Sequence, residues 1–422
     1  MRLVKKPSWL RISGSLPALR RVSGVLDLAA RSCLCLILAP SLLASELWAQ
    51  NAFVFTNDDN VVGANSVSGF LIGKNGVLIQ VPGSPYPTGG VGGGGGYIAA
   101  TKIMVVGTFL YATNDSTRNV SGFSIDPHTG SLTPVPGSPF STGGRVAYGS
   151  SVAATVDGQF LYVVSDRSAD IRIFRIDPDN GRLTGIGEPV RLPGPVDSAN
   201  SMKVSSDGRW LALTLILPSP GSVAMFAIDA ETGGLTAVEG SPFLVRGVEG
   251  RETFAAGVEI NCASDALFVA EASLGGTTVV EVFSIDRETG ALKPIEGSPF
   301  APKVGQNSNV PLLVLDDSVL YVTNIMDNSI AAFAVAPDGS LTLLDGSPFS
   351  AGDTPNPARM VSEPPGSLLH VGKVDPAVVQ VFTIQRTGEL TPVAVSPFPV
   401  GQFAFPLSLV AYPGKSCPTK SK

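Results

Sequence analysis

Charged residues at one position of otherwise apolar strands are the side chains of this sequence most able to do chemistry. Aligning the innermost strands that an internal repeat predicts gives one equivalent position, occupied by Lys102, Ala153, Lys203, Glu259, Leu312, Val361 and Leu409. Lys203 and Glu259 fall on adjacent repeats, and a carboxylate beside an ammonium group can serve as an acid/base pair. We therefore take Glu259 and Lys203 as the candidate catalytic residues.

Further charged residues are expected around the mouth of a central channel, where they would bind an anionic ligand. These candidates are Lys102, Arg145, Arg251, Glu252 and Arg359. The competing interpretation is a structural ion pair between repeats, or solvated channel charges, and we favour it because buried carboxylates and lysines also pair for structural reasons. A catalytic role is supported if Glu259 and two basic groups converge on one point that is open to solvent. A Glu259 that is buried and paired with Lys203 counts against such a role.

The two histidines do not fall on the innermost strands. His128 occupies an outer hairpin turn, where we expect it to be solvated, and His370 lies on a second strand, where we expect it to pack between repeats. Their positions count against a histidine-dependent reaction. A reaction that uses a carboxylate such as Glu259 as the base is still compatible with the sequence.

Other chemical motifs are missing, so we expect neither a metal nor a cofactor. No Cys/His cluster has metal-binding spacing, and no Gly-x-Ser-x-Gly elbow occurs. The run Gly92 to Gly96 is interpreted as a flexible tract, because it lacks the lysine and the helix of a phosphate-binding loop. The polar cluster from Asn57 to Asn60 is interpreted as a solvated turn rather than a calcium loop.

These residues would be positioned by a unit that occurs seven times, exemplified by residues 123–140. Each copy begins with a phenylalanine: Phe70, Phe123, Phe174, Phe226, Phe283, Phe333 and Phe382. A branched aliphatic follows two residues later, then a glycine, then a leucine two residues after the glycine. This pattern predicts a β-hairpin with a glycine-containing turn, and six of the copies exit through Gly-Ser-Pro or a close variant.

A second pair of strands precedes each hairpin, so each unit should form four antiparallel strands. A period of about 50 residues with four short strands predicts an all-β, seven-bladed β-propeller whose blades bury their apolar faces against one another. The segment 52–56 matches a second strand, so the first blade lacks its innermost strand. We expect the strand 407–412 to complete that blade and close the ring.

The long connections fall on one rim of such a ring, and loops on a rigid scaffold are where binding usually occurs. We therefore expect a small-molecule, carbohydrate or protein ligand to bind on this face, over the central channel. The net charge of −6 and the lack of a basic stripe exclude nucleic acid as a partner. We expect the protein to be a monomer.

The first fifty residues differ from the rest. Basic residues precede the apolar run 33–44, which predicts a signal peptide cleaved near Ala49 or Gln50. This gives a signal peptide at 1–50, a propeller at 51–414 and a tail at 415–422, with export to the periplasm or exterior and no stable membrane insertion after cleavage. An uncleaved membrane anchor is the alternative.

The mature chain would keep Cys262 and Cys417. They either form a disulfide that ties the tail across the base of the ring or remain free thiols.

Three short segments carry a resemblance to a known family. Phe53-Val-Phe-Thr-Asn57, Leu110-Tyr-Ala-Thr-Asn114 and Leu320-Tyr-Val-Thr-Asn324 each precede the hairpin unit. Together they resemble the lactonase-type seven-bladed propellers, also called the YVTN-repeat family, which includes 6-phosphogluconolactonases, muconate-lactonising enzymes and secreted repeat proteins. The resemblance implies the fold, and at most the opening or closing of a lactone ring without metal or cofactor. From the sequence we favour a binding scaffold, with a metal-independent lactone hydrolase as the alternative.

Overall fold

The computed structural model describes residues 51–94, 100–143, 149–165, 170–194, 198–217, 219–250, 252–273, 277–302, 304–364, 366–374, 376–401, 408–414 and 417. The expected signal peptide at 1–50 and the candidate ligand residues Arg145 and Arg251 lie outside these residues. Within the ranges given, no helix has the length and apolar character needed to cross a membrane.

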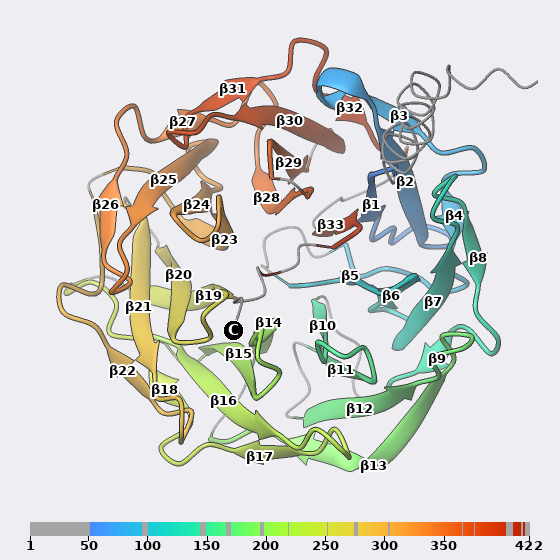
Figure 1. The fold of residues 1–422 in the computed structure, drawn as a ribbon, viewed down its shortest axis with the longest axis horizontal. Coiled ribbons are helices and arrows are strands. Elements are labelled where there is room, and N and C mark those ends of the chain that lie inside the picture. Colours follow the sequence, from blue (N-terminus) through green and yellow to red (C-terminus); the bar gives the residue numbers. More distant parts are fainter. Residues whose placement is uncertain are drawn as a thin grey trace, which may run out of the picture. The chain divides into compact units, whose positions relative to one another are not determined.

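Seven antiparallel sheets surround a common axis, as the sequence predicted (Figure 1). We number the sheets as blades 1 to 7 in chain order, each with four main strands from the axis outward. The innermost strands of blades 1 to 7 are β33 (Ser408–Tyr412), β5 (Ile103–Val106), β10 (Ser150–Ala154), β14 (Ser198–Val204), β19 (Thr253–Ile260), β23 (Ser308–Val314) and β28 (Pro357–Ser362). The second strands are β1 (Phe53–Asn57), β6 (Phe109–Asn114), β11 (Phe160–Ser165), β15 (Trp210–Leu217), β20 (Ala266–Ser273), β24 (Val319–Asn324) and β29 (Leu368–Lys373).

The outer half of each blade is the hairpin predicted from the repeat. The third strands are β2 (Ser66–Ile72), β7 (Asn119–Ile125), β12 (Asp170–Ile176), β16 (Ser222–Ile228), β21 (Val279–Ile285), β25 (Ser329–Val335) and β30 (Val378–Ile384). The outermost strands are β3 (Leu78–Gln80), β8 (Leu132–Pro134), β13 (Leu183–Arg191), β17 (Leu235–Ala237), β22 (Leu292–Pro294), β26 (Leu341–Leu343) and β31 (Leu390–Pro392). Two-residue strands pair with the third strand in five blades: β4 (Tyr86–Pro87), β9 (Phe140–Ser141), β18 (Phe243–Leu244), β27 (Phe349–Ser350) and β32 (Phe398–Pro399). A 3-10 turn, η1 (Lys74–Gly76), joins β2 to β3.

The C-terminal strand closes the ring, as expected. β33 pairs antiparallel with β1, with Phe53 opposite Tyr412 and Asn57 opposite Ser408, so blade 1 combines both ends of the described chain. Figure 1 shows β33 in red between β1 and the axis. The closure is therefore made by main-chain pairing over five residues on each strand.

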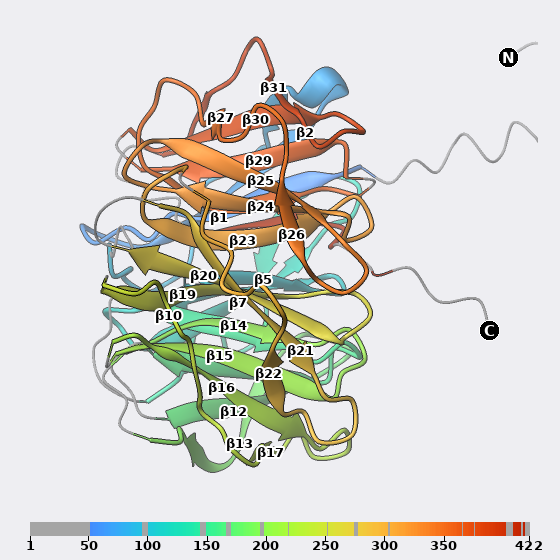
Figure 2. The ribbon, with the colours of Figure 1, turned by 90° about the vertical axis from the view of Figure 1, so that its left-hand side faces the viewer.

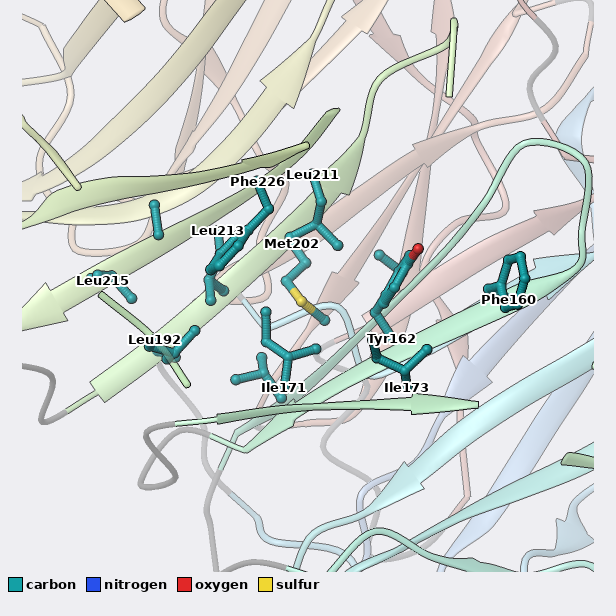
Figure 3. Close-up of a cluster of buried hydrophobic side chains, with 14 residues drawn as sticks. Phe160, Tyr162, Ile171, Ile173, Leu192, Met202, Leu211, Leu213, Leu215 and Phe226 are labelled. Atoms are coloured by element: carbon teal, nitrogen blue, oxygen red, sulfur yellow. The ribbon is translucent and has the colours of Figure 1, made fainter. Parts of the chain in front are cut away.

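Apolar side chains fill the spaces between neighbouring blades. Figure 3 shows one such cluster, in which Phe160, Tyr162 and Ile171 of blade 3 meet Met202 and Leu213 of blade 4. All five are at most 2% exposed. Because a single blade leaves these faces uncovered, each blade depends on its neighbour for burial.

The repeat tyrosines add a hydrogen bond to this packing. Their hydroxyl groups donate to the backbone carbonyl of the hairpin-turn glycine in the next blade, at 2.8 Å for Tyr111 and Gly181 and 3.0 Å for Tyr162 and Gly233. Tyr321 bonds to Gly388 in the same way, at 2.8 Å. The tyrosine of the repeat is thus a structural link between blades.

The serine of the Gly-Ser-Pro exit also has a structural role. In six blades its Oγ accepts a hydrogen bond from a backbone N–H in the third strand, as from Gly122 to Ser138 at 3.0 Å and from Met225 to Ser241 at 2.9 Å. Blade 3 lacks this exit because Glu188-Pro189-Val190 replaces it, and its outermost strand β13 continues for nine residues.

Cys262 and Cys417 form a disulfide, with a Cα–Cα separation of 5.3 Å. Cys262 lies in the turn after β19 of blade 5, whereas Cys417 follows β33 of blade 1. The bridge therefore joins two blades that are not neighbours. Of the two alternatives given for these cysteines, the structure shows the disulfide that attaches the tail.

We expect Gly290→Ala to destabilise the ring more than Gly208→Ala. Both glycines have φ near +75°, where a side chain is strained, but a Cβ at Gly290 would lie 2.5 Å from the Trp210 ring while a Cβ at Gly208 meets nothing within 4 Å. The strain common to both should cost about 1 kcal/mol, and crowding at Gly290 should add about 1–3 kcal/mol. Denaturant unfolding of both variants measures the difference, and equal losses would contradict the packing role of the turn.

We expect replacement of the disulfide by Cys262→Ser and Cys417→Ser to lower the free energy of unfolding by about 2–4 kcal/mol, because the bridge restrains the unfolded chain. Denaturant unfolding under oxidising and reducing conditions measures this loss. Reduction should destabilise the parent protein and leave the double variant unchanged. Reduction that destabilises both equally would show that another effect is responsible.

Candidate functional site

The candidate catalytic residues lie at the end of the axis opposite the long loops. Tight turns join the innermost to the second strands and the third to the outermost strands, so we call this side the tight-turn rim and the other the long-loop rim. Figure 2 shows the ring from the side, with the strands running between the two rims. Lys203 and Glu259 are the penultimate residues of β14 and β19, which both end at the tight-turn rim. Figure 1 shows these two innermost strands next to each other around the axis. The pair is therefore separated from the loops that the sequence analysis favoured for binding.

Lys203 and Glu259 form an ion pair. Lys203 Nζ lies 2.6 Å from Glu259 Oε1, and the Glu259 side chain is 9% exposed while that of Lys203 is 38% exposed. The same carboxylate oxygen also accepts a hydrogen bond from the backbone N–H of Ile260, at 3.3 Å. Because both contacts occupy the Glu259 carboxylate, the geometry favours a structural ion pair over a free catalytic base.

Arg359 is the third charged group near this pair. It lies on β28 of blade 7, two residues before the position equivalent to Glu259, and is partly exposed. Burial lowers the pKa of its guanidinium to about 10, and the Glu259 carboxylate opposes that shift. Lys203, Glu259 and Arg359 therefore form an axial cluster of charged side chains.

The strand register corrects the alignment that placed Lys102 and Leu409 with these residues. Glu259 pairs with Phe268 and Lys203 with Ala212, and the corresponding positions in blades 2 and 1 are Met104, opposite Tyr111, and Val410, opposite Phe55. The equivalent position therefore carries two charged residues instead of three.

Lys102 is a buried structural cation. Its Nζ lies 2.6 Å from Asp59 Oδ2 and 2.9 Å from Asp115 Oδ2, and all three side chains are 0% exposed. The neighbouring carboxylates outweigh the burial penalty and keep the pKa of Lys102 above its usual value. A ligand could reach Lys102 only by displacing these partners. Asp59 and Asp115 were not predicted as its partners, because Asp59 lies 43 residues before Lys102 in the sequence.

The polar cluster from Asn57 to Asn60 is not the solvated turn that the sequence suggested. Asp58 and Asp59 are at most 1% exposed, because the crossover from blade 1 to blade 2 covers them. The described part of the glycine tract lies directly against this loop: Gly93 N–H donates to Asp59 Oδ1 at 2.8 Å, and a Cβ at Gly92 would lie 2.3 Å from the Asp59 carbonyl carbon. These glycines permit close backbone packing, which corrects their interpretation as a flexible tract.

The remaining candidates are separated from the axial cluster. Glu252 is exposed on the crossover that precedes β19, at the long-loop rim. His128 is exposed in its turn, as expected. His370 is fully buried between blades, also as expected, and burial lowers its pKa to about 4.

The fold and the axial cluster define a seven-bladed β-propeller with a charged axis. The chain belongs to the family described as lactonase, 7-bladed beta-propeller, whose model matches residues 84–199 and 277–404. No curated protein matches the chain.

Several solved structures share the fold. A candidate 6-phosphogluconolactonase of Bacteroides fragilis NCTC 9343 superposes with a TM-score of 0.66 at 18% identity, covering 86% of this chain and 99% of that one. A second, from Bacteroides uniformis ATCC 8492, gives 0.66 at 20% identity with the same coverage. The periplasmic gluconolactonase PpgL of Pseudomonas aeruginosa gives 0.65 at 18% identity, covering 86% and 98%.

Lys102→Met and Lys203→Met should differ in their effect on stability. Lys102→Met leaves two buried carboxylates without their cation, which should cost about 3–5 kcal/mol. Lys203→Met removes a partly exposed partner of Glu259 and should cost at most about 1 kcal/mol. Denaturant unfolding of both variants measures the difference. A loss for Lys203→Met as large as that for Lys102→Met would show that the axial pair is equally structural.

Proposed function

We propose that this member of the lactonase propeller family is an exported binding scaffold, which holds its ligand at the long-loop rim over the axis. The observation that carries this proposal is the capping of Glu259 by Lys203 at 2.6 Å. A carboxylate held by an ammonium group and largely buried is poorly placed to take a proton from water or substrate. The ion pair therefore favours binding over hydrolysis.

Charge and loop placement support the choice of rim. Glu252 is exposed there, and the crossovers between blades at this rim are longer than the turns at the opposite one. Variable loops on a rigid ring suit recognition of a small molecule, a carbohydrate or a protein.

Export is part of the proposal. The disulfide between Cys262 and Cys417 is of a kind that persists in oxidising compartments. The structurally similar PpgL is named as a periplasmic protein. Both features agree with the basic and apolar pattern of residues 1–50, which suggests a signal peptide.

A lactone hydrolase is the second candidate, favoured by the family match and by the proximity of Arg359 to the ion pair. In this alternative Lys203 and Arg359 would bind the anionic part of a substrate, and Glu259 would act as the base. Release of Glu259 from Lys203 when the substrate binds would then be required.

An assay of the mature protein against a panel of sugar lactones separates the two candidates. We expect no lactone to be hydrolysed above its uncatalysed rate, and we expect panel members that bind to raise the thermal unfolding temperature. Glu259→Gln is the test variant and Glu288→Gln, at an exposed hairpin turn, its matched control; activity kept in Glu288→Gln is the reference, and Glu252→Gln tests the binding rim. Hydrolysis that is lost in Glu259→Gln and kept in Glu288→Gln would replace the scaffold by the hydrolase.

A further inference from the structure

Blade 5 carries two buried glutamates on the face that packs against blade 4. Glu271 lies on β20 and Glu281 on β21, and both are 0% exposed. Glu271 pairs with Val279 and Glu281 with Val269, so the carboxylates are diagonal neighbours on the same face of the sheet. The same face of blade 5 carries Leu267, Val269 and Phe283, which pack with Val223 and Met225 of blade 4.

Among the described residues, Glu281 forms an ion pair and Glu271 does not. Arg246, on the crossover from blade 4 to blade 5, places its Nε 2.7 Å from Glu281 Oε1, and its backbone N–H donates to Glu281 Oε2. Its guanidinium also donates to the carbonyl of Ser298 in blade 5. Arg246 therefore attaches the crossover to blade 5 through Glu281.

Glu271 has no comparable partner. Neither of its carboxylate oxygens has a hydrogen-bond partner among the described residues, and the buried Thr253 hydroxyl on the neighbouring strand does not complete one of ordinary geometry. Burial first and the Glu281 carboxylate second raise the pKa of Glu271 to about 8, against the opposing effects of Thr253 and Arg246. When Glu271 is protonated it is neutral, so the charge of Arg246 is balanced by Glu281 alone.

Equivalent positions in three other blades carry fully bonded groups, and two of these groups hold the incoming crossover. In blade 2, Asn114 Oδ1 accepts a hydrogen bond from Thr88 Oγ1 at 2.7 Å, and in blade 7, Lys373 Nζ donates to the carbonyl of Ala351 at 2.6 Å. In blade 1 the position is taken by Asp58, whose carboxylate accepts hydrogen bonds from three hydroxyl groups. Glu271 thus occupies an anchoring position without the donors that an ionised carboxylate needs.

We propose that the protonation state of Glu271 controls the Arg246–Glu281 anchor: while Glu271 is protonated, Arg246 is held by Glu281 alone, and when Glu271 ionises it competes for the guanidinium and loosens the crossover from blade 4 to blade 5. Ionisation also puts a second negative charge beside Glu281, so the two carboxylates repel each other. The folded state favours the protonated form, so the stabilisation is present at low pH and is lost as pH rises from about 4.5 toward 8. The crossover leads to Glu252 at the long-loop rim, so alkaline pH would loosen that part of the rim.

Hydrogen exchange of the backbone amides from Val245 to Glu249, corrected for intrinsic rates, tests this anchor. Between pH 7 and pH 9 we expect their protection in the parent protein to fall about tenfold, the factor for one pH unit above the midpoint. Glu271→Gln should remove this fall, and Glu252→Gln, an exposed control on the same crossover, should retain it. The infrared band of a protonated buried carboxyl group should also be present at pH 7 in the parent and absent in Glu271→Gln.

Three outcomes would overturn the proposal. The first is a fall in protection that is the same in Glu271→Gln as in the parent. The second is the absence of the protonated-carboxyl band at pH 7, which tests the idea even if the variant does not fold. The third is recovery of protection at pH 9 on addition of sodium or calcium ions, which would make the glutamate pair a metal-cation site.

Discussion

The pairing of β33 with β1 is the contact on which the other packing depends. Each blade buries aromatic and aliphatic side chains against its neighbours, so an open ring would leave two such faces in water. Blade 1 would also lose its innermost strand, because that strand comes from the opposite end of the chain. The Lys102 triad lies at this junction: Asp59 follows β1, whereas Lys102 and Asp115 belong to blade 2, and Ser408 Oγ of β33 accepts a hydrogen bond from the Lys102 backbone N–H at 3.0 Å. Charge pairing and strand pairing therefore stabilise the same joint.

The residues that make the repeat recognisable are the ones that join the blades. The repeat tyrosine bonds to the turn glycine of the next blade, the exit serine bonds to the third strand, and the asparagine Asn114 holds the incoming crossover. Selection for a closed ring is sufficient to explain all three. This is why membership of the lactonase propeller family determines the architecture of this chain and leaves its chemistry to be decided by residues outside the repeat.

The sequence predicted the blades well because each hairpin is local. The spacing between Phe123, the turn and Leu132 fixes the register of β7 against β8, and no distant residue is needed. The register of the innermost strands was harder to predict, and the assignments of Lys102 and Leu409 were wrong. Lys102 was placed by counting back a fixed number of residues from the second strand, but the turn in blade 2 is shorter: Met104 pairs with Tyr111, seven residues on, whereas Ala153 of blade 3 pairs with Tyr162, nine residues on. Leu409 lies on a strand that pairs with β1 from the other end of the chain, so no turn length fixes its register. The burial of Asp59 and the unpartnered state of Glu271 likewise depend on contacts between distant segments, which a single repeat does not encode.

Different contacts join distant segments of the chain at the two rims of the ring. At the tight-turn rim the disulfide between Cys262 and Cys417 brings the tail that follows β33 to blade 5, only three residues from Glu259. Neighbouring turns are also joined there, since Ser206 Oγ donates to the carbonyl of Cys262 at 2.6 Å and the Cys262 backbone N–H donates to Asp317. The Lys203–Glu259 pair thus lies among contacts that connect blades 4, 5 and 6. At the long-loop rim the crossovers are also attached to the blades, by Thr88 to Asn114 in blade 2 and by Arg246 to Glu281 in blade 5, so contacts between distant segments fix both ends of the ring.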